Sequence, residues 1–211
     1  MGLPIARQGF PYMAAGLALA VILGAWGSRT GFILVLALTG FVAAFFRDPE
    51  RRIPADKNAI LSPADGRVLL VEPGSPGGNG GEAGTKISIF MSVFNCHVNR
   101  LPAAGTVRDL RYSPGRFFAA HQDRASGQNE QNALRLEGEG GREITVVQIA
   151  GLIARRIVCW VKVGDRLAAG TRFGLIQFGS RVDLYLPAGA RLTVRRGDRV
   201  KAGLSVMGYW T

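Results

Sequence analysis

The sequence of 211 residues contains few of the side chains on which redox and imidazole chemistry depend. It has two cysteines, Cys96 and Cys159, which form neither a CxxC pair nor a disulfide framework, so a reducing, cytoplasmic setting is expected. It has two histidines, His97 and His121, and any imidazole chemistry near neutral pH must use one of them. We expect no metal site.

Acidic residues are also scarce: 15 Asp and Glu stand against 26 Lys and Arg, which gives a net charge of +11. A protein this basic can bind nucleic acid or an anionic membrane surface. The sequence lacks a basic stripe with interleaved aromatic residues and lacks zinc-knuckle spacing, so nucleic acid is not expected as a partner. An anionic membrane is favoured because the chain has an apolar segment of its own.

That segment consists of two runs with almost no polar residues, Phe10–Trp26 and Phe32–Phe46, separated by the turn Gly27–Gly31. Each run is slightly shorter than the roughly 20 residues that a bilayer crossing needs. We therefore predict a helical hairpin that either spans the bilayer or dips into it. Arg7 before the hairpin and Arg47 after it favour a cytoplasmic location for both ends. A secretory signal is the rival interpretation, and the second apolar run argues against it.

After Pro54 the pattern changes to short apolar runs separated by turns, such as Arg67–Val71 and Lys86–Phe90, which is typical of strands. An internal repeat follows: Val161–Gly170 matches Val194–Gly203 at a spacing of 33 residues, and each copy contains a Gly-Asp turn. These turns resemble those of biotinyl and lipoyl carrier domains, which are flattened β-sandwiches. A carrier role itself is disfavoured, because no lysine lies between the copies.

The fold class predicted from these patterns is mainly β (α+β). We expect residues 1–53 to form the membrane-associated hairpin. Residues 54–211 are expected to form a carrier-like β-sandwich or barrel that carries the catalytic site.

The step Gly179-Ser180 lies between two strand-like apolar runs. A serine hydroxyl can attack the carbonyl of the residue before it, and glycine tolerates the strained backbone that this attack requires. The resulting ester can eliminate to dehydroalanine, which hydrolyses to a pyruvoyl group at the start of a new chain. Most Gly-Ser pairs are simple turns, so the interpretation depends on the groups around this one.

Cleavage needs a base to accept the hydroxyl proton and a group that orients the base. His97 follows an apolar strand, and His121 is the alternative base. Asp65 lies in the turn Ser62–Val68, where a carboxylate can hold an imidazole in one tautomer. Taken singly, an Asp-Gly turn is usually only a turn and a lone histidine is usually structural.

Six segments, in order along nearly the whole chain, resemble a known family, the short bacterial (type A) form of phosphatidylserine decarboxylase. These segments are Phe45–Arg51, Ser62–Gly66, Phe94–Arg100, Asn129–Asn132, Gln148–Ile157 and Phe178–Asp183. Six ordered matches are far more specific than any one of them.

The resemblance implies a proenzyme that cleaves itself between Gly179 and Ser180, giving a β chain of residues 1–179 and an α chain of residues 180–211. Ser180 would become a covalent pyruvoyl group, whose carbonyl condenses with the amine of the serine headgroup and accepts electrons as carbon dioxide leaves. The product would be phosphatidylethanolamine. Asp65 and His97 match the aspartate and histidine of the family's triad.

Longer family members carry a second histidine where Asn99 or Arg100 stands here. The resemblance therefore implies that His97 serves both cleavage and decarboxylation. Arg155 and Arg156 are candidates for binding a phosphate or carboxylate, and a solvated strand edge is the alternative for this pair.

The implied partners are phosphatidylserine, at the cytoplasmic face of the inner membrane, and the chain's own fragments as an α–β heterodimer. A higher oligomer is left open. Two other functions compete. One is a non-enzymatic, membrane-anchored β-sandwich adaptor, and the other is a pyruvoyl decarboxylase of a soluble amino acid, which has no need of an apolar hairpin.

Overall fold

The computed structural model describes residues 4–75, 84–118, 128–152 and 156–211. Arg155 and His121 lie outside these ranges. The chain forms two compact units, one that ends at Glu50 and one that comprises Arg51–Thr211.

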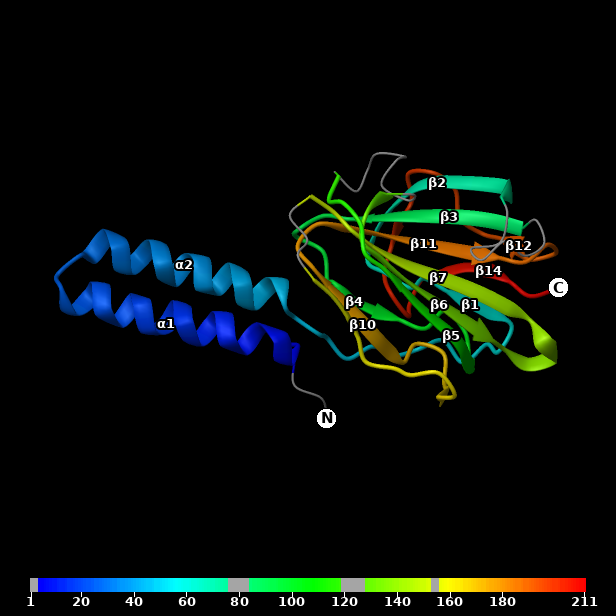
Figure 1. The fold of residues 1–211 in the computed structure, drawn as a ribbon, viewed down its shortest axis with the longest axis horizontal. Coiled ribbons are helices and arrows are strands. Elements are labelled where there is room, and N and C mark those ends of the chain that lie inside the picture. The colour runs from blue at the N-terminus through cyan, green and yellow to red at the C-terminus, as the bar shows by residue number, and fades with distance from the viewer. Residues whose placement is uncertain (1–3, 76–83, 119–127, 153–155) are drawn as a thin grey trace. The chain divides into compact units, whose positions relative to one another are not determined.

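The first unit is a pair of apolar helices, as the sequence predicts (Figure 1). A short 3₁₀ turn, η1 (Arg7–Gly9), leads into α1 (Phe10–Ala25), and α2 (Arg29–Phe45) follows after a turn. Gly16 lies against Thr39 so closely that a side chain there would collide with the threonine hydroxyl. That hydroxyl donates to the carbonyl oxygen of Val35 at 2.8 Å, which satisfies it within an apolar surrounding.

Large apolar side chains cover the outside of this unit. Val21, Trp26, Leu34 and Leu38 are each more than half exposed. Among the described residues, Arg7–Ala25 is the one helical stretch long and apolar enough to cross a bilayer, with 19 residues, and α2 is shorter. An exposed apolar surface of this kind is consistent with membrane association.

The second unit is built almost wholly from antiparallel strands, which confirms the predicted mainly-β class. Its largest sheet has the order β13-β2-β3-β11-β7-β6-β5-β9. In chain order its members are β2 (Gly66–Ser75), β3 (Gly84–Met91), β5 (Gly105–Ser113), β6 (Gln131–Glu137), β7 (Glu143–Ala150), β9 (Arg166–Leu167), β11 (Ser180–Leu186) and β13 (Arg199–Val200). A second 3₁₀ turn, η2 (Glu139–Gly141), separates β6 from β7.

Two small sheets complete the unit, with the orders β1-β14-β12 and β4-β10-β8. Their strands are β1 (Ala59–Leu61), β4 (Val98–Arg100), β8 (Arg156–Cys159), β10 (Arg172–Gln177), β12 (Arg191–Leu192) and β14 (Val206–Tyr209). In the described residues the edge strands of the large sheet, β13 and β9, do not pair with each other. The sheet therefore does not close, and the barrel alternative is not realised.

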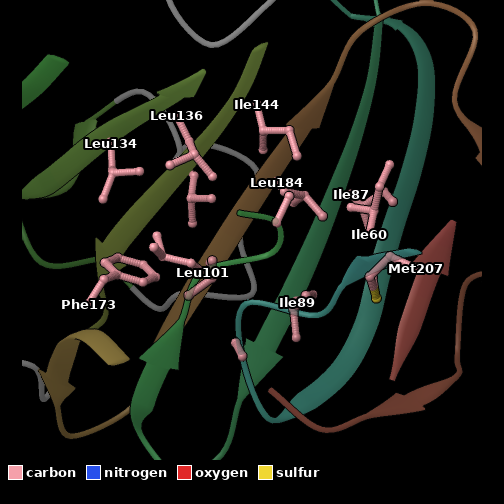
Figure 2. Packing of buried hydrophobic residues seen from close by; sticks show 14 of the residues in the cluster. Ile60, Ile87, Ile89, Leu101, Leu134, Leu136, Ile144, Phe173, Leu184 and Met207 are labelled. Atoms are coloured by element: carbon pink, nitrogen blue, oxygen red, sulfur yellow. The ribbon is translucent and has the colours of Figure 1, made fainter. Parts of the chain in front are cut away.

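One hydrophobic cluster holds the three sheets together. Figure 2 shows Leu134, Leu136 and Leu184 of the large sheet in the same cluster as Phe173 of β10 and Met207 of β14. These side chains are almost completely buried. Along β11, Val182, Leu184 and Leu186 alternate with residues of the opposite face, which is the period of two that a strand imposes.

The internal repeat forms two matching turns. Gly164 donates its N–H to Val107, and Gly197 donates to Val68, at 2.9 and 2.8 Å. Both glycines have a positive φ, +94° and +98°, which an L side chain adopts at a cost. Each turn then runs beside the start of a long strand: β9 beside Gly105 of β5, and β13 beside Gly66 of β2.

The strands that meet these turns begin with a second repeated segment. This segment is only four residues long, and the sequence analysis did not predict it. Pro63-Ala64-Asp65-Gly66 corresponds to Pro102-Ala103-Ala104-Gly105. The two segments bond to each other reciprocally: Leu61 N–H donates to Pro102 at 2.7 Å, and Arg100 N–H donates to Pro63 at 3.0 Å. The fold of the second unit is therefore approximately two-fold symmetric around these turns.

Candidate functional site

Ser180 is the first residue of β11, the strand at the middle of the large sheet. It pairs with Met91, the last residue of β3, on one side and with Ala150, the last residue of β7, on the other. Its side chain is completely buried. The hydroxyl donates to Met91 Sδ at 3.5 Å, and thioether sulfur is a weak acceptor. The serine is thus held at a sheet end by a weak hydrogen bond from its hydroxyl to a thioether.

The backbone immediately before Ser180 is strained. Phe178 has a φ of 62° and is the one non-glycine residue with positive φ in the described part of the chain. Gly179 also lies in the left-handed region, with a φ of 52°. For a bulky residue such as phenylalanine this conformation is an outlier, and strain of this kind concentrates at functional sites. The strain lies directly beside the peptide bond that the sequence marks for cleavage.

His97 lies at the end of the loop that begins at Met91. The ring is completely buried, and its Nδ1 lies 3.0 Å from the carbonyl oxygen of Asn95. A carbonyl can only accept, so this contact assigns the proton of the neutral ring to Nδ1 and the lone pair to Nε2. The backbone carbonyl of His97 accepts from Ile176 N–H at 3.4 Å, which ties the loop to β10 four residues before Ser180.

Asp65 is held by a different partner from the one the sequence suggested. Arg51 binds its carboxylate with two bonds, Nη1 to Oδ1 at 2.6 Å and Nη2 to Oδ2 at 2.9 Å. Ala202 N–H adds a third bond to Oδ1 at 2.8 Å. Across the described residues, the carboxylate's hydrogen bonds go to these two residues, and the predicted Asp65–His97 contact is not among them.

A row of buried side-chain amides connects the sheet to the serine. Asn132 Nδ2 donates to Gln148 Oε1 at 3.1 Å, and Gln148 Nε2 donates to Asn99 Oδ1 at 2.9 Å. Asn99 Nδ2 then lies 3.4 Å from the carbonyl oxygen of Pro63 and 3.8 Å from Met91 Sδ, the sulfur that also accepts from Ser180. Asn132 and Gln148 each donate to the next amide of the row, and the row ends at Asn99 Nδ2 beside Pro63 and Met91.

This row also joins the predicted segments to each other. Pro63 belongs to the Asp65 turn, Asn99 to the strand after His97, and Met91 to the strand beside Ser180. Gly174 makes room for the row, because a side chain there would meet Gln148 Nε2. The structure therefore brings all three predicted segments into one neighbourhood without a direct Asp65–His97 bond.

The side chain that follows Ser180 faces the other side of the sheet. Arg181 binds Asp183 at 2.6 and 3.2 Å and donates to Ser88 Oγ at 2.7 Å, and all three side chains are buried. Burial first, and then the charge of Asp183, raise the pKa of the neighbouring Tyr185 to about 12. This charged group anchors β11 immediately after the step Gly179-Ser180.

Of the two candidate arginines, Arg156 is exposed, and it pairs through its backbone with Gln177 of β10. Gln177 directly precedes the strained Phe178-Gly179 step, so Arg156 lies on the strand beside the residue before that step. The other arginine and the alternative base, His121, lie outside the described residues.

Sequence reasoning gave no structural role to four residues of this neighbourhood: Arg51, Met91, Asn99 and Gln148. Arg51, Asn99 and Gln148 fall within the segments that carry the family resemblance, so a signal existed for them. The resemblance indicates only that these positions matter, and it does not indicate which groups they contact.

Comparison with known proteins identifies the family of this chain. The family model described as phosphatidylserine decarboxylase matches residues 38–208. A phosphatidylserine decarboxylase proenzyme of Geobacter metallireducens is 49% identical over 210 residues, covering 97% of this chain and 96% of the relative. Proteins with the same description from Geotalea uraniireducens and Burkholderia ambifaria are 48% and 47% identical, with 97% and 96% of this chain covered. The chain belongs to the phosphatidylserine decarboxylase family, a family of decarboxylating enzymes, and the relatives named above are described as proenzymes.

Proposed function

We propose that this chain cleaves itself between Gly179 and Ser180, converts Ser180 to a pyruvoyl group, and then decarboxylates phosphatidylserine to phosphatidylethanolamine. The observation that carries the proposal is the strained step Phe178-Gly179 directly before a buried serine at a sheet end. Strain there raises the energy of the peptide that must be attacked and is relieved when it breaks.

In the cleavage step, Ser180 Oγ bonds to the Gly179 carbonyl carbon while the bond from that carbon to the serine nitrogen breaks, which leaves an ester and a free amine. Loss of the serine α-proton then breaks the Cβ–Oγ bond and releases Gly179 as a carboxylate. Water replaces the nitrogen, which leaves as ammonia. A base must accept the hydroxyl proton, and His97 suits this role because its neutral ring carries the lone pair on Nε2.

Asp65 is proposed as a positioning residue for the same step. Its ion pair with Arg51 and its bond to Ala202 hold the turn that contains Pro63. Pro63 in turn accepts from the backbone of Arg100 and the side chain of Asn99, both on the strand after His97. The carboxylate therefore acts on the histidine loop through the packing of this turn.

The surroundings of residue 180 suit a pyruvoyl group. This group has one heavy atom fewer than the serine it replaces, so it fits the buried space between Met91 and Ala150 without displacing them. When formed, it supplies a carbonyl that takes up the substrate amine and withdraws electrons as carbon dioxide leaves. His97 is proposed to return a proton to the substrate carbon, and Arg156 to bind the phosphate or carboxylate of the headgroup.

The two fragments are proposed to stay together as an α–β heterodimer. The α chain would begin with β11, which is paired with β3 on one side and β7 on the other, both from the β chain. Its later strands add further pairs, β13 with β2 and β14 with β1. Because breaking one peptide bond removes none of these ladders, we expect the fragments to separate only on unfolding.

The apolar helices are proposed to anchor the protein to the inner membrane, with the catalytic unit on the cytoplasmic side. Residues 1–53 would then be the membrane-associated domain and residues 54–211 the catalytic domain. Phosphatidylserine lies in that membrane, and the excess of basic residues suits an anionic lipid surface.

Intact mass spectrometry of the purified protein tests the proposal. We expect two chains, broken after Gly179, with the fragment 180–211 lighter by one ammonia than a peptide that begins with serine. Ser180→Ala should remain a single chain and release no carbon dioxide from phosphatidylserine. Ser180→Ala protein that is cut and active would refute the assignment, and a wild-type chain that stays whole would favour the adaptor function.

A further inference from the structure

The large sheet has one end at which all the loops around Ser180 emerge. β3 and β7 both finish beside Ser180, at Met91 and Ala150, and β11 starts there. β5 also finishes at this end, since its last residue, Ser113, pairs with Gln131, which in turn pairs with Ile149. The described residues that directly follow β3, β5 and β7 therefore lie at the end of the sheet where Ser180 begins β11.

Each of these loops places a large apolar side chain in solvent. Phe94, after β3, is 75% exposed, and Leu152, after β7, is 66% exposed. Phe117, after β5, is 38% exposed. The segment that contains Phe117 is bound to the end of β7, because Asn129 donates to both Phe118 and Ala150, at 2.8 and 2.7 Å. Three independent loops thus present apolar tips around the same end.

Two exposed arginines lie beside these tips, and Glu130, whose N–H donates to the carbonyl oxygen of Arg116 at 3.0 Å, is a partly exposed acidic neighbour. Arg116 precedes Phe117 and is exposed, and the exposed Arg156 pairs with Gln177 near the strained step. Apolar and aromatic tips flanked by arginines are the composition that enters the headgroup region of an anionic bilayer. A single exposed apolar residue needs no explanation, but a set that rims one functional end does.

We propose that this end of the second unit is itself a membrane-contacting surface. Phe94, Leu152 and Phe117 would enter the interface of an anionic bilayer, and Arg116 and Arg156 would lie at the level of the phosphates. This proposal rests on the proposed function, because it explains how a lipid headgroup reaches a buried serine without leaving the membrane. The contact is additional to the apolar helices, which need only anchor the chain.

A site-specific probe tests the contact without using activity. The full-length Cys159→Ser protein would carry one introduced cysteine, Phe94→Cys or Leu152→Cys, labelled with an environment-sensitive dye and reconstituted in phosphatidylcholine vesicles that contain about a third phosphatidylserine. The matched control is Val163→Cys. Val163 is 56% exposed but lies in the Gly-Asp turn beside β9, at the opposite end of β5 from Ser113.

We expect the dyes at 94 and 152 to shift to the blue and to be quenched by nitroxide-bearing lipids, while the dye at 163 stays as in water. If the dyes at 94 and 152 keep their emission in water and are not quenched in the reconstituted protein, the proposal is overturned. These loops would then be a candidate surface for a protein partner. The same readout works on the uncleaved Ser180→Ala chain, so failure of this proposal and failure of the proposed chemistry are separable.

An activity measurement gives a second, independent outcome. The double variant Phe94→Ser/Leu152→Ser should cleave itself normally and keep its rate on a dispersed short-chain phosphatidylserine. On vesicles it should need about tenfold more lipid for half its maximal rate, while Val163→Ser should match the wild type. Equal loss on both substrates would show that the loops serve the reaction itself and would overturn the membrane role.

Discussion

The two halves of the second unit make corresponding backbone hydrogen bonds but differ in the residue at one functional position. In one half, the turn Gly197–Gly203 holds the segment that contains Asp65. In the other, the turn Gly164–Gly170 holds the equivalent segment, which carries Ala104 instead. The hydrogen bonds correspond closely: Gly203 N–H donates to Ser62 and Gly170 N–H donates to Leu101, both at 2.8 Å.

The comparison shows that this turn does not need a carboxylate to form. With alanine at 104 the same bonds are made, so Asp65 is not required by the geometry of the turn. Its carboxylate is buried, which is costly without partners, and Arg51 and Ala202 supply them. A buried ion pair present in only one of two equivalent places indicates that it was retained for a purpose other than folding.

The largest effect is expected when Asp65 is replaced by alanine, the residue at the equivalent position 104 of the other half. Asp65→Ala should slow self-cleavage by at least about 100-fold, because the segment that positions the His97 loop loses its anchor. It should also lower the free energy of unfolding by about 3–5 kcal/mol, since the buried Arg51 guanidinium loses the carboxylate with which it pairs. Cleavage is followed on denaturing gels and stability by urea titration.

Ala104→Ser is the matched control at the equivalent position and should change neither quantity measurably, because Ala104 is exposed. If Asp65→Ala were processed at the wild-type rate, the difference between the halves would be only structural.

A smaller effect is expected when the ion pair is weakened but its charge is kept. Arg51→Lys replaces a two-pronged contact with a single ammonium, so cleavage should slow by about tenfold and unfolding should become easier by about 1–3 kcal/mol. Arg52→Lys, at the exposed neighbour, serves as the control. Equal self-cleavage rates for Arg51→Lys and Arg52→Lys would show that Arg51 has no role in the reaction.

The conformation at Phe178 offers a contrast with both turns. The turns place glycine where φ is positive, whereas this step places phenylalanine there. Phe178→Gly should relax the step and slow cleavage about fivefold, corresponding to about 1 kcal/mol of lost strain. Phe178→Leu keeps the strain and should cleave like the wild type. Faster cleavage of the glycine variant in a time course would refute a role for strain.

The last prediction concerns stability alone and tests whether the two halves are equivalent where function is not involved. Gly164→Ala and Gly197→Ala should each lower the free energy of unfolding by about 1–2 kcal/mol, because both have a φ near +95° and neither site has an atom that an added Cβ would strike. The two values from urea titration should agree within about 0.5 kcal/mol. A large difference would show that the pseudo-symmetry is only geometric.

Much of the molecule follows from local patterns. The apolar runs predicted the two helices, the alternation after Pro54 predicted strands, and the repeat predicted two similar turns, all of which the structure contains. The family follows from six ordered segments, and the comparisons confirm it. The step Gly179-Ser180 is predicted as the cleavage site because self-cleavage needs a serine hydroxyl, and a glycine before it tolerates the strained backbone of the attack.

The tertiary structure decided the contacts among these parts. It placed Arg51, rather than His97, on Asp65, and it set Met91 and Asn99 between the turn and the serine. It also set the backbone at Phe178 in a strained conformation. Local patterns record propensity and period, which depend on neighbours along the chain. Buried ion pairs, hydrogen-bonded rows and strain depend on residues brought together from distant segments, and packing of the whole sheet selects them.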